Sequence, residues 1–288
     1  MKRKRSTLIL HPILNPHDPF SYIDTLKFFI RSDTLIPNDI LNPYIESLID
    51  SKIPFPVNSP QIASAFFKIK YNIPISFSSS SQQISIHRLN IANLHFLSNF
   101  YLPKLQELFL QGNKLSDLSP LSTLTNLTHL SLFQNSIKDI SPLSNLTKLQ
   151  DLSLFYNKIT DISPLSNLTN LTHLHLNENN ITNIFPLSNL TNLQELFLSY
   201  NNITNISPLS NLINLQHLFL NDNSITDISP LSSLTNLIYI YLSNNKIKDI
   251  SPLSNLTKLK YLYLSNNSIS NQDIQNLQRF IPNCTIHI

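Results

Sequence analysis

Glycine is almost absent from this sequence, which contains one glycine, Gly112, among 288 residues. Phosphate-cradling loops, dinucleotide-binding fingerprints and the nucleophile elbow of hydrolases each need several glycines at fixed spacing. The sequence therefore excludes all three kinds of site. Turns that need a positive φ angle must be built from other residues, and we expect asparagine to take most of these positions.

Cysteine is equally scarce, since Cys284 is the only one in the chain. A single thiol excludes a disulfide within the chain and a zinc site built from several cysteines. Charged residues amount to 13%, and residues 102–277 carry 9 Lys and Arg against 11 Asp and Glu. A surface that follows phosphates needs a basic excess, so we expect no nucleic-acid partner.

Long apolar runs are missing as well. Because no stretch of about 18 apolar residues occurs, we expect no membrane span. The basic start, MKRKRSTLILHPILNP, has its apolar run interrupted by His11 and Pro12, and no small-residue cleavage site follows. We therefore expect no signal peptide and a cytoplasmic location.

A repeat of 22 residues dominates the rest of the sequence. LTNLTHLSLFQNSIKDISPLSN at 124–145 is followed by LTKLQDLSLFYNKITDISPLSN at 146–167 and LTNLTHLHLNENNITNIFPLSN at 168–189. Eight copies in register cover 102–277, and we interpret ISIHRLNIANLHFL at 84–97 as a degenerate, slightly short first repeat. Such a period is typical of solenoids, in which each copy buries its apolar face against its neighbours.

Each copy has the pattern of a short strand followed by a turn. In the copy at 168–189, Leu174 and Leu176 alternate on a strand and point inward, and Asn179 recurs at every repeat. A buried asparagine ladder can satisfy backbone groups where the chain leaves the sheet. In the SPLSN segment we expect the serine to cap a short helical turn that begins at the proline.

This pattern resembles the leucine-rich repeat family, in particular the 22-residue subtype found in bacterial internalins and in the leucine-rich regulatory subunit of protein phosphatase 1. The resemblance implies an α/β solenoid. A curved parallel sheet would line its concave side, with short 3-10 or helical turns on its convex side. The resemblance also implies a protein partner, but it leaves the identity of that partner open, because the fold serves many functions.

The two ends of the chain differ from the repeats. Residues 271–280 predict an amphipathic helix and CTIHI predicts a last short strand, which together would cap the core and bury Cys284. The helix-start signals before the repeats are Asp18-Pro19, Asn42-Pro43 and Ser59-Pro60. We therefore divide the chain into a helical N-terminal region with a polar linker, 1–83, and the solenoid, 84–288, with regular repeats at 102–277 and a cap at 271–288.

Residues that alternate with the core leucines are expected to face the concave surface in columns. The first column is Glu107, His129, Asp151, His173, Glu195, His217, Tyr239 and Tyr261. The second column is Phe109, Ser131, Ser153, His175, Phe197, Phe219, Tyr241 and Tyr263. The third column is Gln111, Phe133, Phe155, Asn177, Ser199, Asn221, Ser243 and Ser265, and the next loop position holds Tyr156, Glu178, Tyr200 and Asp222.

Aromatic side chains gather toward the C-terminal end of these columns. Since leucines already fill the inner positions, the aromatic residues are expected to be exposed, and an exposed aromatic cluster indicates a protein-binding patch. The predicted anchors are Phe197, Phe219, Tyr239, Tyr241, Tyr261 and Tyr263. The predicted surface also includes the aromatic residues Phe133, Phe155, Tyr156 and Tyr200.

The first six residues of the first column alternate between an acid and a histidine. Neighbours on adjacent strands are close enough to pair, and a nearby carboxylate favours the protonated imidazole. We expect these polar residues to orient the partner: His129, Asp151, His173, His175, Glu195 and His217. The remaining interpretations are charge matching on a wet surface, partner recognition that weakens as pH rises, and a metal or catalytic site at His173 and His175. An open face without a pocket or lid argues against the last.

The sequence thus predicts a monomeric, non-enzymatic protein-binding module without cofactor or metal. One alternative is a secreted or host-delivered interaction protein of internalin type, which would need another export route. An alternative of a different class is a metal-binding or enzymatic site at His173 and His175.

Overall fold

The structure is a computed structural model, and it describes residues 64–65, 80–94, 97 and 102–288. The helices expected between 18 and 72 lie outside these residues, apart from Ser64 and Ala65, which are helical. The chain divides into two units, Met1–Ser78 and Ser79–Ile288, and the second unit contains all the repeats.

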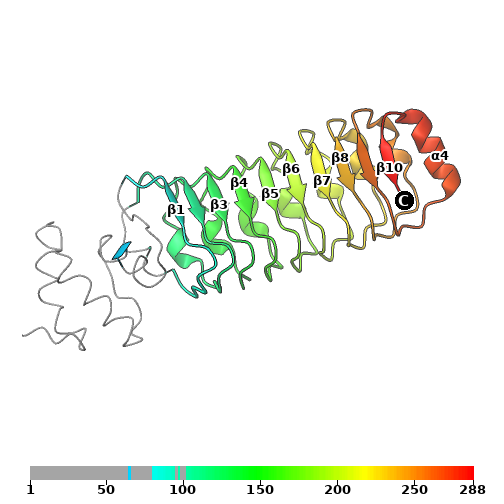
Figure 1. Ribbon diagram of the computed structural model, residues 1–288. Coiled ribbons are helices and arrows are strands. Elements are labelled where there is room, and N and C mark those ends of the chain that lie inside the picture. The colour runs from blue at the N-terminus through cyan, green and yellow to red at the C-terminus, as the bar shows by residue number, and fades with distance from the viewer. Residues whose placement is uncertain (1–63, 66–79, 95–96, 98–101) are drawn as a thin grey trace, which may run out of the picture. The chain divides into compact units, whose positions relative to one another are not determined.

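Parallel strands in chain order form one sheet along the repeats (Figure 1). Within the described residues, the ten strands are β1 Gln83–Ser85, β2 Glu107–Phe109, β3 His129–Ser131, β4 Asp151–Ser153, β5 His173–His175, β6 Glu195–Phe197, β7 His217–Phe219, β8 Tyr239–Tyr241, β9 Tyr261–Tyr263 and β10 Thr285–His287. Each strand pairs with the next one in the sequence, so the predicted α/β solenoid is confirmed.

The strand register follows the repeat. Leu108 of β2 pairs with Leu130 of β3, and this offset of 22 residues recurs up to β9. Ile84 pairs with Leu108, however, at an offset of 24 residues, as Leu262 does with Ile286. The first repeat is therefore longer than the period, not slightly short as predicted. The apolar strand residues fix the register because they must enter the core.

Leucine and isoleucine side chains fill the core. In the copy at 168–189, seven of them are exposed by 1% or less: Leu168, Leu171, Leu174, Leu176, Ile181, Ile184 and Leu187. Burying one such side chain contributes about 1.5–3 kcal/mol. Because each repeat covers the next, the core is continuous along the solenoid and no repeat is stable alone.

Short 3-10 helices return the chain on the side of the coil opposite the sheet (Figure 1). They are η3 Ser119–Leu121, η4 Ser141–Leu143, η5 Ser163–Leu165, η6 Phe185–Leu187, η7 Ser207–Leu209, η8 Ser229–Ser233 and η9 Ser251–Asn255. The serine does not cap them, contrary to the prediction, because it is already the first helical residue. The N-cap position of η5 is Ile162, which makes no side-chain cap bond. The Asp or Asn two residues before the first helical residue binds that residue's N–H instead: Asp161 Oδ1 accepts from the Ser163 N–H at 2.8 Å. The backbone and hydroxyl hydrogen bonds from Ser163 lower the pKa of the Asp161 carboxyl.

The predicted asparagine ladder is confirmed. Asn179 Oδ1 accepts from the Ile159 N–H at 3.0 Å, and its Nδ2 donates to the carbonyls of Leu154 at 3.1 Å and Leu176 at 3.0 Å. The equivalent residues that hydrogen-bond in this way are Asn113, Asn135, Asn157, Asn201, Asn223, Asn245 and Asn267. Each ladder residue ties the turn of its own repeat to the preceding repeat.

The residue before each ladder asparagine has a positive φ angle. Gly112 suits this position, since a Cβ there would come within 2.8 Å of Arg88 Cγ. In the other repeats the φ angles lie between 54 and 57° at Gln134, Tyr156, Glu178, Tyr200, Asp222, Asn244 and Asn266. The expectation that asparagine would fill these positions is therefore wrong for most repeats. The ladder hydrogen bonds fix the turn strongly enough to hold residues other than glycine and asparagine in this costly backbone conformation.

The C-terminal cap forms as predicted. Helix α4, Asn271–Phe280, begins after Ser270, whose Oγ accepts from the Asp273 N–H at 3.1 Å. Cys284 is buried beside it, and this burial raises the pKa of the thiol to about 11, so the thiol stays protonated at neutral pH. None of the helices in the described part of the chain has the length and apolar character needed to cross a bilayer.

Candidate functional site

The outward surface of the sheet carries the three predicted columns, and we call it the sheet face. The strand pairing places the column members side by side: Glu195 lies opposite His217, and Phe197 lies opposite Phe219. The last strand adds one residue that was not predicted, since His287 of β10 pairs with Tyr263. The CTIHI segment was predicted as a strand, but its register with β9 could not be read from the repeat.

The rings of the second column stack in one row, which we call the ring ladder. Its members are His175, Phe197, Phe219, Tyr241, Tyr263 and His287, with successive centroid distances of 4.3, 4.2, 4.3, 4.1 and 4.2 Å. All pairs are within 11° of parallel except Phe197 and Phe219, which are tilted by 57°. A histidine therefore closes the ladder at each end.

Stacking decides which part of each ring a ligand can reach. Because neighbouring rings cover each other's faces, the ladder presents mainly ring edges, which carry the positive end of the aromatic quadrupole. Burial raises the pKa of the Tyr241 hydroxyl, and the neighbouring Tyr263 hydroxyl adds to this rise. The surface suits apolar groups, aromatic faces and hydrogen-bond acceptors better than cations, which bind ring faces.

The other predicted aromatic residues lie in two further groups. Tyr239 and Tyr261 of the first column stack beside the ladder with their centroids 5.1 Å apart, and His217 and Tyr239 form a T-shaped pair with a centroid distance of 5.0 Å. Phe133 and Phe155 stack at 4.3 Å as a separate pair nearer the N-terminal end. Two tyrosines outside these groups, each exposed by 55%, are Tyr156 and Tyr200. The structure thus brings together the six predicted anchors and separates the rest from them.

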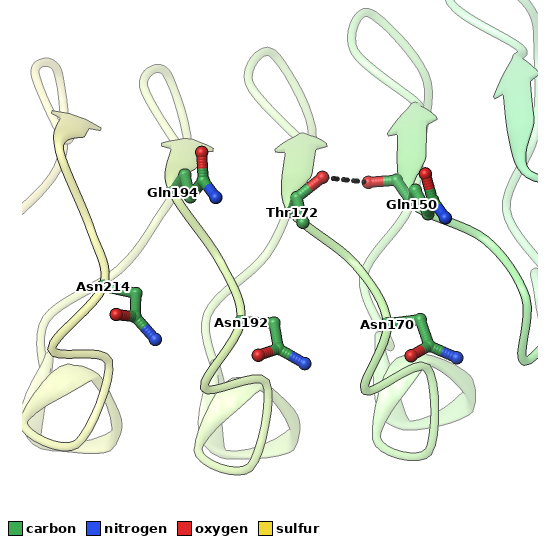
Figure 2. Close-up of a pocket in the computed structure, with 6 residues that line it drawn as sticks. All are labelled: Gln150, Asn170, Thr172, Asn192, Gln194 and Asn214. Carbon is green, nitrogen blue, oxygen red and sulfur yellow. Dashed lines mark hydrogen bonds between the residues drawn. The ribbon is translucent and has the colours of Figure 1, made fainter.

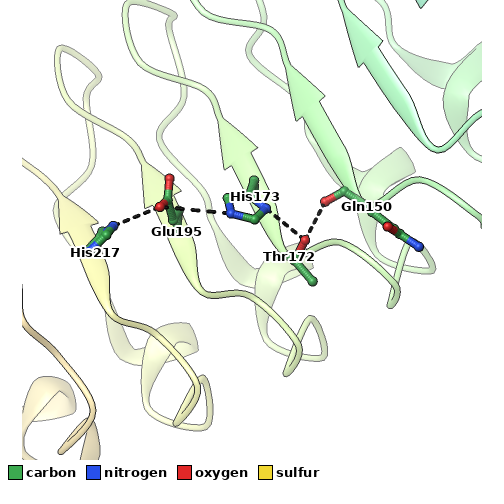
Figure 3. Close-up of polar contacts among 5 residues, drawn as sticks. All are labelled: Gln150, Thr172, His173, Glu195 and His217. Carbon is green, nitrogen blue, oxygen red and sulfur yellow. Dashed lines mark hydrogen bonds and ion pairs between the residues drawn. The ribbon is translucent and has the colours of Figure 1, made fainter. Parts of the chain in front are cut away.

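Polar contacts in the first column centre on Glu195 (Figure 3). His217 Nδ1 donates to Glu195 Oε1 at 2.9 Å, and His173 Nε2 lies 4.0 Å from the same oxygen. The Thr172 hydroxyl donates to the Gln150 carbonyl at 3.0 Å, so it accepts from His173 Nδ1 at 2.9 Å. The neutral His173 ring therefore carries its proton on Nδ1, away from Glu195.

Of the possible acid–histidine pairs in the first column, which the structure describes in full, only those around Glu195 form. Among the described residues, no ion pair within 4.0 Å joins Asp151 to His129 or His173. The threonine that precedes each of these histidines takes the Nδ1 atom instead, as Thr128 does for His129 at 2.9 Å. Acid and histidine alternate in the sequence, but local threonines compete successfully for the rings.

At the second-column histidine, His175, burial outweighs the charges of the nearby carboxylates. The charges of Asp151 and Glu195 do raise the pKa of His175, but the larger effect of burial lowers it below its ordinary value. Its Nε2 atom is buried and has no hydrogen-bond partner. His175 is therefore a neutral member of the ring ladder.

The metal hypothesis for His173 and His175 finds no geometric support. In the part of the chain that the structure describes, no group of three or more His, Cys, Asp or Glu side chains is arranged to hold a metal ion. His173 is engaged by Thr172 and faces Glu195, whereas His175 lies flat against Phe197.

A polar pocket of about 470 Å³ lies beside the N-terminal ends of β4 to β7 (Figure 2). Its lining consists of uncharged residues: Gln150, Asn170, Thr172, Asn192, Gln194 and Asn214. We call it the amide pocket. This pocket was not predicted from the sequence. The side chains that line it precede the strands, outside the three predicted columns.

A second row of asparagines forms one wall of this pocket. Nδ2 of Asn170, Asn192 and Asn214 each donates, at 2.8 Å, to a threonine carbonyl of the preceding repeat. Asn126 and Asn236 continue this row outside the pocket, and each donates to a backbone carbonyl of the preceding repeat at 2.9 Å. We call these five asparagines the amide row. The row was not predicted, although the recurring LTN triplet was the available signal.

Comparison with known proteins agrees with this architecture. The family model described as leucine-rich repeats (2 copies) matches residues 125–167, 169–211, 191–233, 213–255 and 235–279, more than half of the chain. A search of the curated proteins finds no match.

Solved structures extend the comparison. An internalin (inlF) from Listeria monocytogenes is 35% identical, with a TM-score of 0.62, over 72% of this chain and 66% of its own. Internalin C2 (inlC2) from the same organism is 40% identical, with a TM-score of 0.60, over 66% of this chain and 80% of its own. The plant peptide hormone receptor RGFR1, in complex with RGF2, is 30% identical, with a TM-score of 0.57, over 67% of this chain and 33% of its own.

These matches agree with the stacked repeats, the buried leucines and the asparagine ladder. Leucine-rich repeat proteins are generally protein-interaction modules, and the fold is generally a non-enzymatic scaffold. The chain belongs to the leucine-rich repeat family and resembles the internalins.

Proposed function

We propose that this chain binds a protein partner on the sheet face, with the ring ladder and the Tyr239–Tyr261 pair as the contact surface. The observation that carries the proposal is the continuous stack from His175 to His287 on the open side of the sheet. The core needs none of these rings, because leucines already fill it. A contiguous aromatic surface of this kind marks an interaction site.

The chemistry of the ladder fits the centre of a protein interface. Such centres are rich in aromatic residues and poor in charge, and polar groups form the rim. No Asp, Glu, Lys or Arg interrupts the second column between Phe197 and Tyr263, whereas Glu195 and His217 lie beside it. Stacked rings have little freedom left to lose, so binding on them costs little side-chain entropy.

The peptide complex among the similar structures supports a polypeptide partner. The RGFR1 structure holds RGF2, so a repeat solenoid similar to this one accommodates a polypeptide ligand. We expect the partner of the present chain to offer apolar and aromatic side chains to the ladder and hydrogen-bond acceptors to its tyrosines.

A double substitution tests the proposal. Phe219→Ala with Tyr241→Ala removes two adjacent rungs, and truncating one buried aromatic anchor typically costs about 2 kcal/mol, or about thirtyfold in affinity. The partner is first identified by co-purification with the wild-type chain, and its affinity for each variant is then measured by calorimetry. We expect at least this loss for the double variant.

Phe185→Ala provides the matched control. Phe185 is also an exposed aromatic residue, at 69%, but it lies on η6 and not on the sheet face. We expect its removal to leave the affinity unchanged. If the double variant keeps its circular dichroism spectrum and still binds like the control, the partner does not dock on the ladder.

A second candidate function follows from the similarity to two internalins. We propose, as the alternative, that the chain is an internalin-like interaction protein that acts outside the cell that makes it. The identities of 35% and 40%, over 72% and 66% of this chain, support this candidate. Fractionation of the source cells separates the two: the protein in the medium or on the surface favours the alternative, and the protein in the cytosol contradicts it.

A further inference from the structure

The amide pocket has a binding chemistry of its own. We propose that it binds a primary ammonium group, and that a lysine side chain of the protein partner supplies it. The choice of a partner lysine rests on the proposed function, whereas the ammonium preference rests on the pocket alone.

The pocket wall presents a row of side-chain acceptors. One N–H of each Nδ2 of Asn170, Asn192 and Asn214 donates to a backbone carbonyl of the preceding repeat, and this bond fixes the orientation of the amide. Figure 2 shows these three amides in the same orientation, each with its nitrogen turned toward the preceding repeat. Their Oδ1 atoms are therefore left as a row of exposed acceptors, and a ligand that satisfies them must donate.

The same amide row already binds ammonium groups on both sides of the pocket. Lys148 Nζ donates to Asn126 Oδ1 at 2.6 Å, and Lys258 Nζ donates to Asn236 Oδ1 at 2.7 Å. In each case the lysine occupies the row position of the following repeat. Within the pocket the positions after Asn170 and Asn192 hold asparagine instead, so no lysine of the row reaches these acceptors.

Other ligand classes fit the lining less well. A sugar ring would lack an aromatic platform, because no ring lines the pocket, and an anion would lack a cation to pair with. An ammonium group has three donors and can bridge two row oxygens and the side-chain oxygen of Gln150 or Gln194. Asp151 and Glu195, which follow these glutamines, place negative charge nearby, whereas the ammonium of Lys148 is held at Asn126.

The position of the pocket connects it with the proposed interface. It lies beside the ends of β4 to β7, and the ring ladder crosses β5 to β10, so the two surfaces share three strands. A partner that lies on the ladder can therefore extend a lysine across the first column into the pocket.

A nuclear magnetic resonance titration tests the ammonium preference on the full chain. The probe is Nα-acetyl-lysine methylamide, and the signals are the side-chain amides of the row. We expect saturable shifts at Asn170, Asn192 and Asn214, and none with the Nε-acetylated probe, which has lost its charge. Asn192→Leu should weaken binding about tenfold, since a hydrogen bond to a charged group is lost.

Asn236→Leu is the matched control, because it removes an amide of the same row outside the pocket. It should leave probe binding unchanged. Equal shifts with both probes, no saturable shift, or equal weakening in both variants would overturn the ammonium site. None of these results would contradict the proposed binding on the ring ladder, which the Phe219→Ala and Tyr241→Ala pair tests separately.

The source of the ammonium group is tested with the co-purified partner. We expect Asn192→Leu, but not Asn236→Leu, to weaken partner binding. Acetylation of the partner's lysines should weaken its binding to the wild-type chain but cause no further loss of affinity for Asn192→Leu. If Asn192→Leu abolishes probe binding yet leaves partner affinity unchanged, the partner lysine is refuted. Tighter binding of spermidine than of the lysine probe would then assign the site to a free amine.

Discussion

His175 lies in the second column against Phe197, with the two rings 4.3 Å apart and 4° from parallel. Two carboxylates act on it, yet burial outweighs them and lowers its pKa from 6.5. At the scale of a single residue, the charge of the ring is therefore decided by the groups packed around it, and not by the alternation of acid and histidine along the sequence.

A pH-dependent stability follows from this residue. The unfolded chain binds a proton at His175 near pH 6.5, but the folded chain does so only at lower pH. Stability is therefore lost as the pH falls through 6.5 toward the lowered pKa, and the loss is absent above it. His175→Phe removes this group and keeps the stack. We expect urea unfolding between about pH 7.5 and about pH 5.5 to show a smaller loss for His175→Phe than for the wild type.

His129→Phe serves as the comparison for this experiment, because His129 lies in the first column and hydrogen-bonds Thr128. We expect it to retain the wild-type loss between the two pH values. An identical loss in His175→Phe and in the wild type would show that the buried ring does not couple folding to pH.

At the scale of the repeat, two asparagine rows have different roles. The ladder row is buried or half-buried, with Asn179 exposed by 8%, and Asn179 makes several hydrogen bonds to backbone groups. The amide row is exposed, and Asn170 makes a single bond to the Thr147 carbonyl. The same residue type thus holds the turn in one row and lines the amide pocket in the other.

Substituting one asparagine from each row should separate these roles. Asn179→Leu leaves the Ile159 N–H without a partner and removes one of the two asparagine hydrogen bonds to each of the Leu154 and Leu176 carbonyls, which keep Asn157 and Asn201. We therefore expect a loss of about 2–5 kcal/mol in the free energy of unfolding. Asn170→Leu should cost about 1 kcal/mol or less, because water replaces the lost bond. Denaturant titration of both variants checks this, and comparable losses would contradict the assignment.

At the scale of the whole solenoid, stability comes from stacking, and the ends are the weak points. The cap covers the last repeat: Ile274 and Leu277 of α4 are buried, and β10 pairs with the otherwise open edge of β9. An uncovered edge strand exposes backbone donors and acceptors that recruit other chains. The cap therefore keeps both the core and the sheet edge closed.

Removing the cap should destabilise the chain more than removing a whole repeat does. A chain that ends at Ser270 exposes Leu262 and Leu264, and we expect it to unfold at lower temperature and to self-associate. Deleting 190–211 joins equivalent positions of two neighbouring repeats, so the shortened chain should keep its cooperative unfolding. Light scattering and thermal unfolding measure both effects. A stable, monodisperse chain without the cap would show that the last repeat closes the core by itself.

Much of this protein could be predicted from its sequence because the repeat makes spatial neighbours readable. Residues 22 positions apart lie on adjacent strands, so the period by itself determined the strand order, the buried leucines, the ladder of Asn179 and the columns of the sheet face. The capping helix was also predictable, since a Ser270 cap and the apolar spacing of Ile274 and Leu277 are local signals.

Only the tertiary structure decided how side chains in these columns share their partners. Thr172 and Glu195 compete for His173, Phe197 buries His175, and β10 brings His287 onto the ladder across an offset that breaks the period. In the amide pocket, the hydrogen bond from each asparagine Nδ2 to a carbonyl of the preceding repeat orients the amide, and this orientation leaves its Oδ1 atom available as an acceptor. A periodic sequence specifies which residues are neighbours. Which hydrogen bonds and stacking contacts form depends on distances and burial, and these exist only after the repeats have packed together.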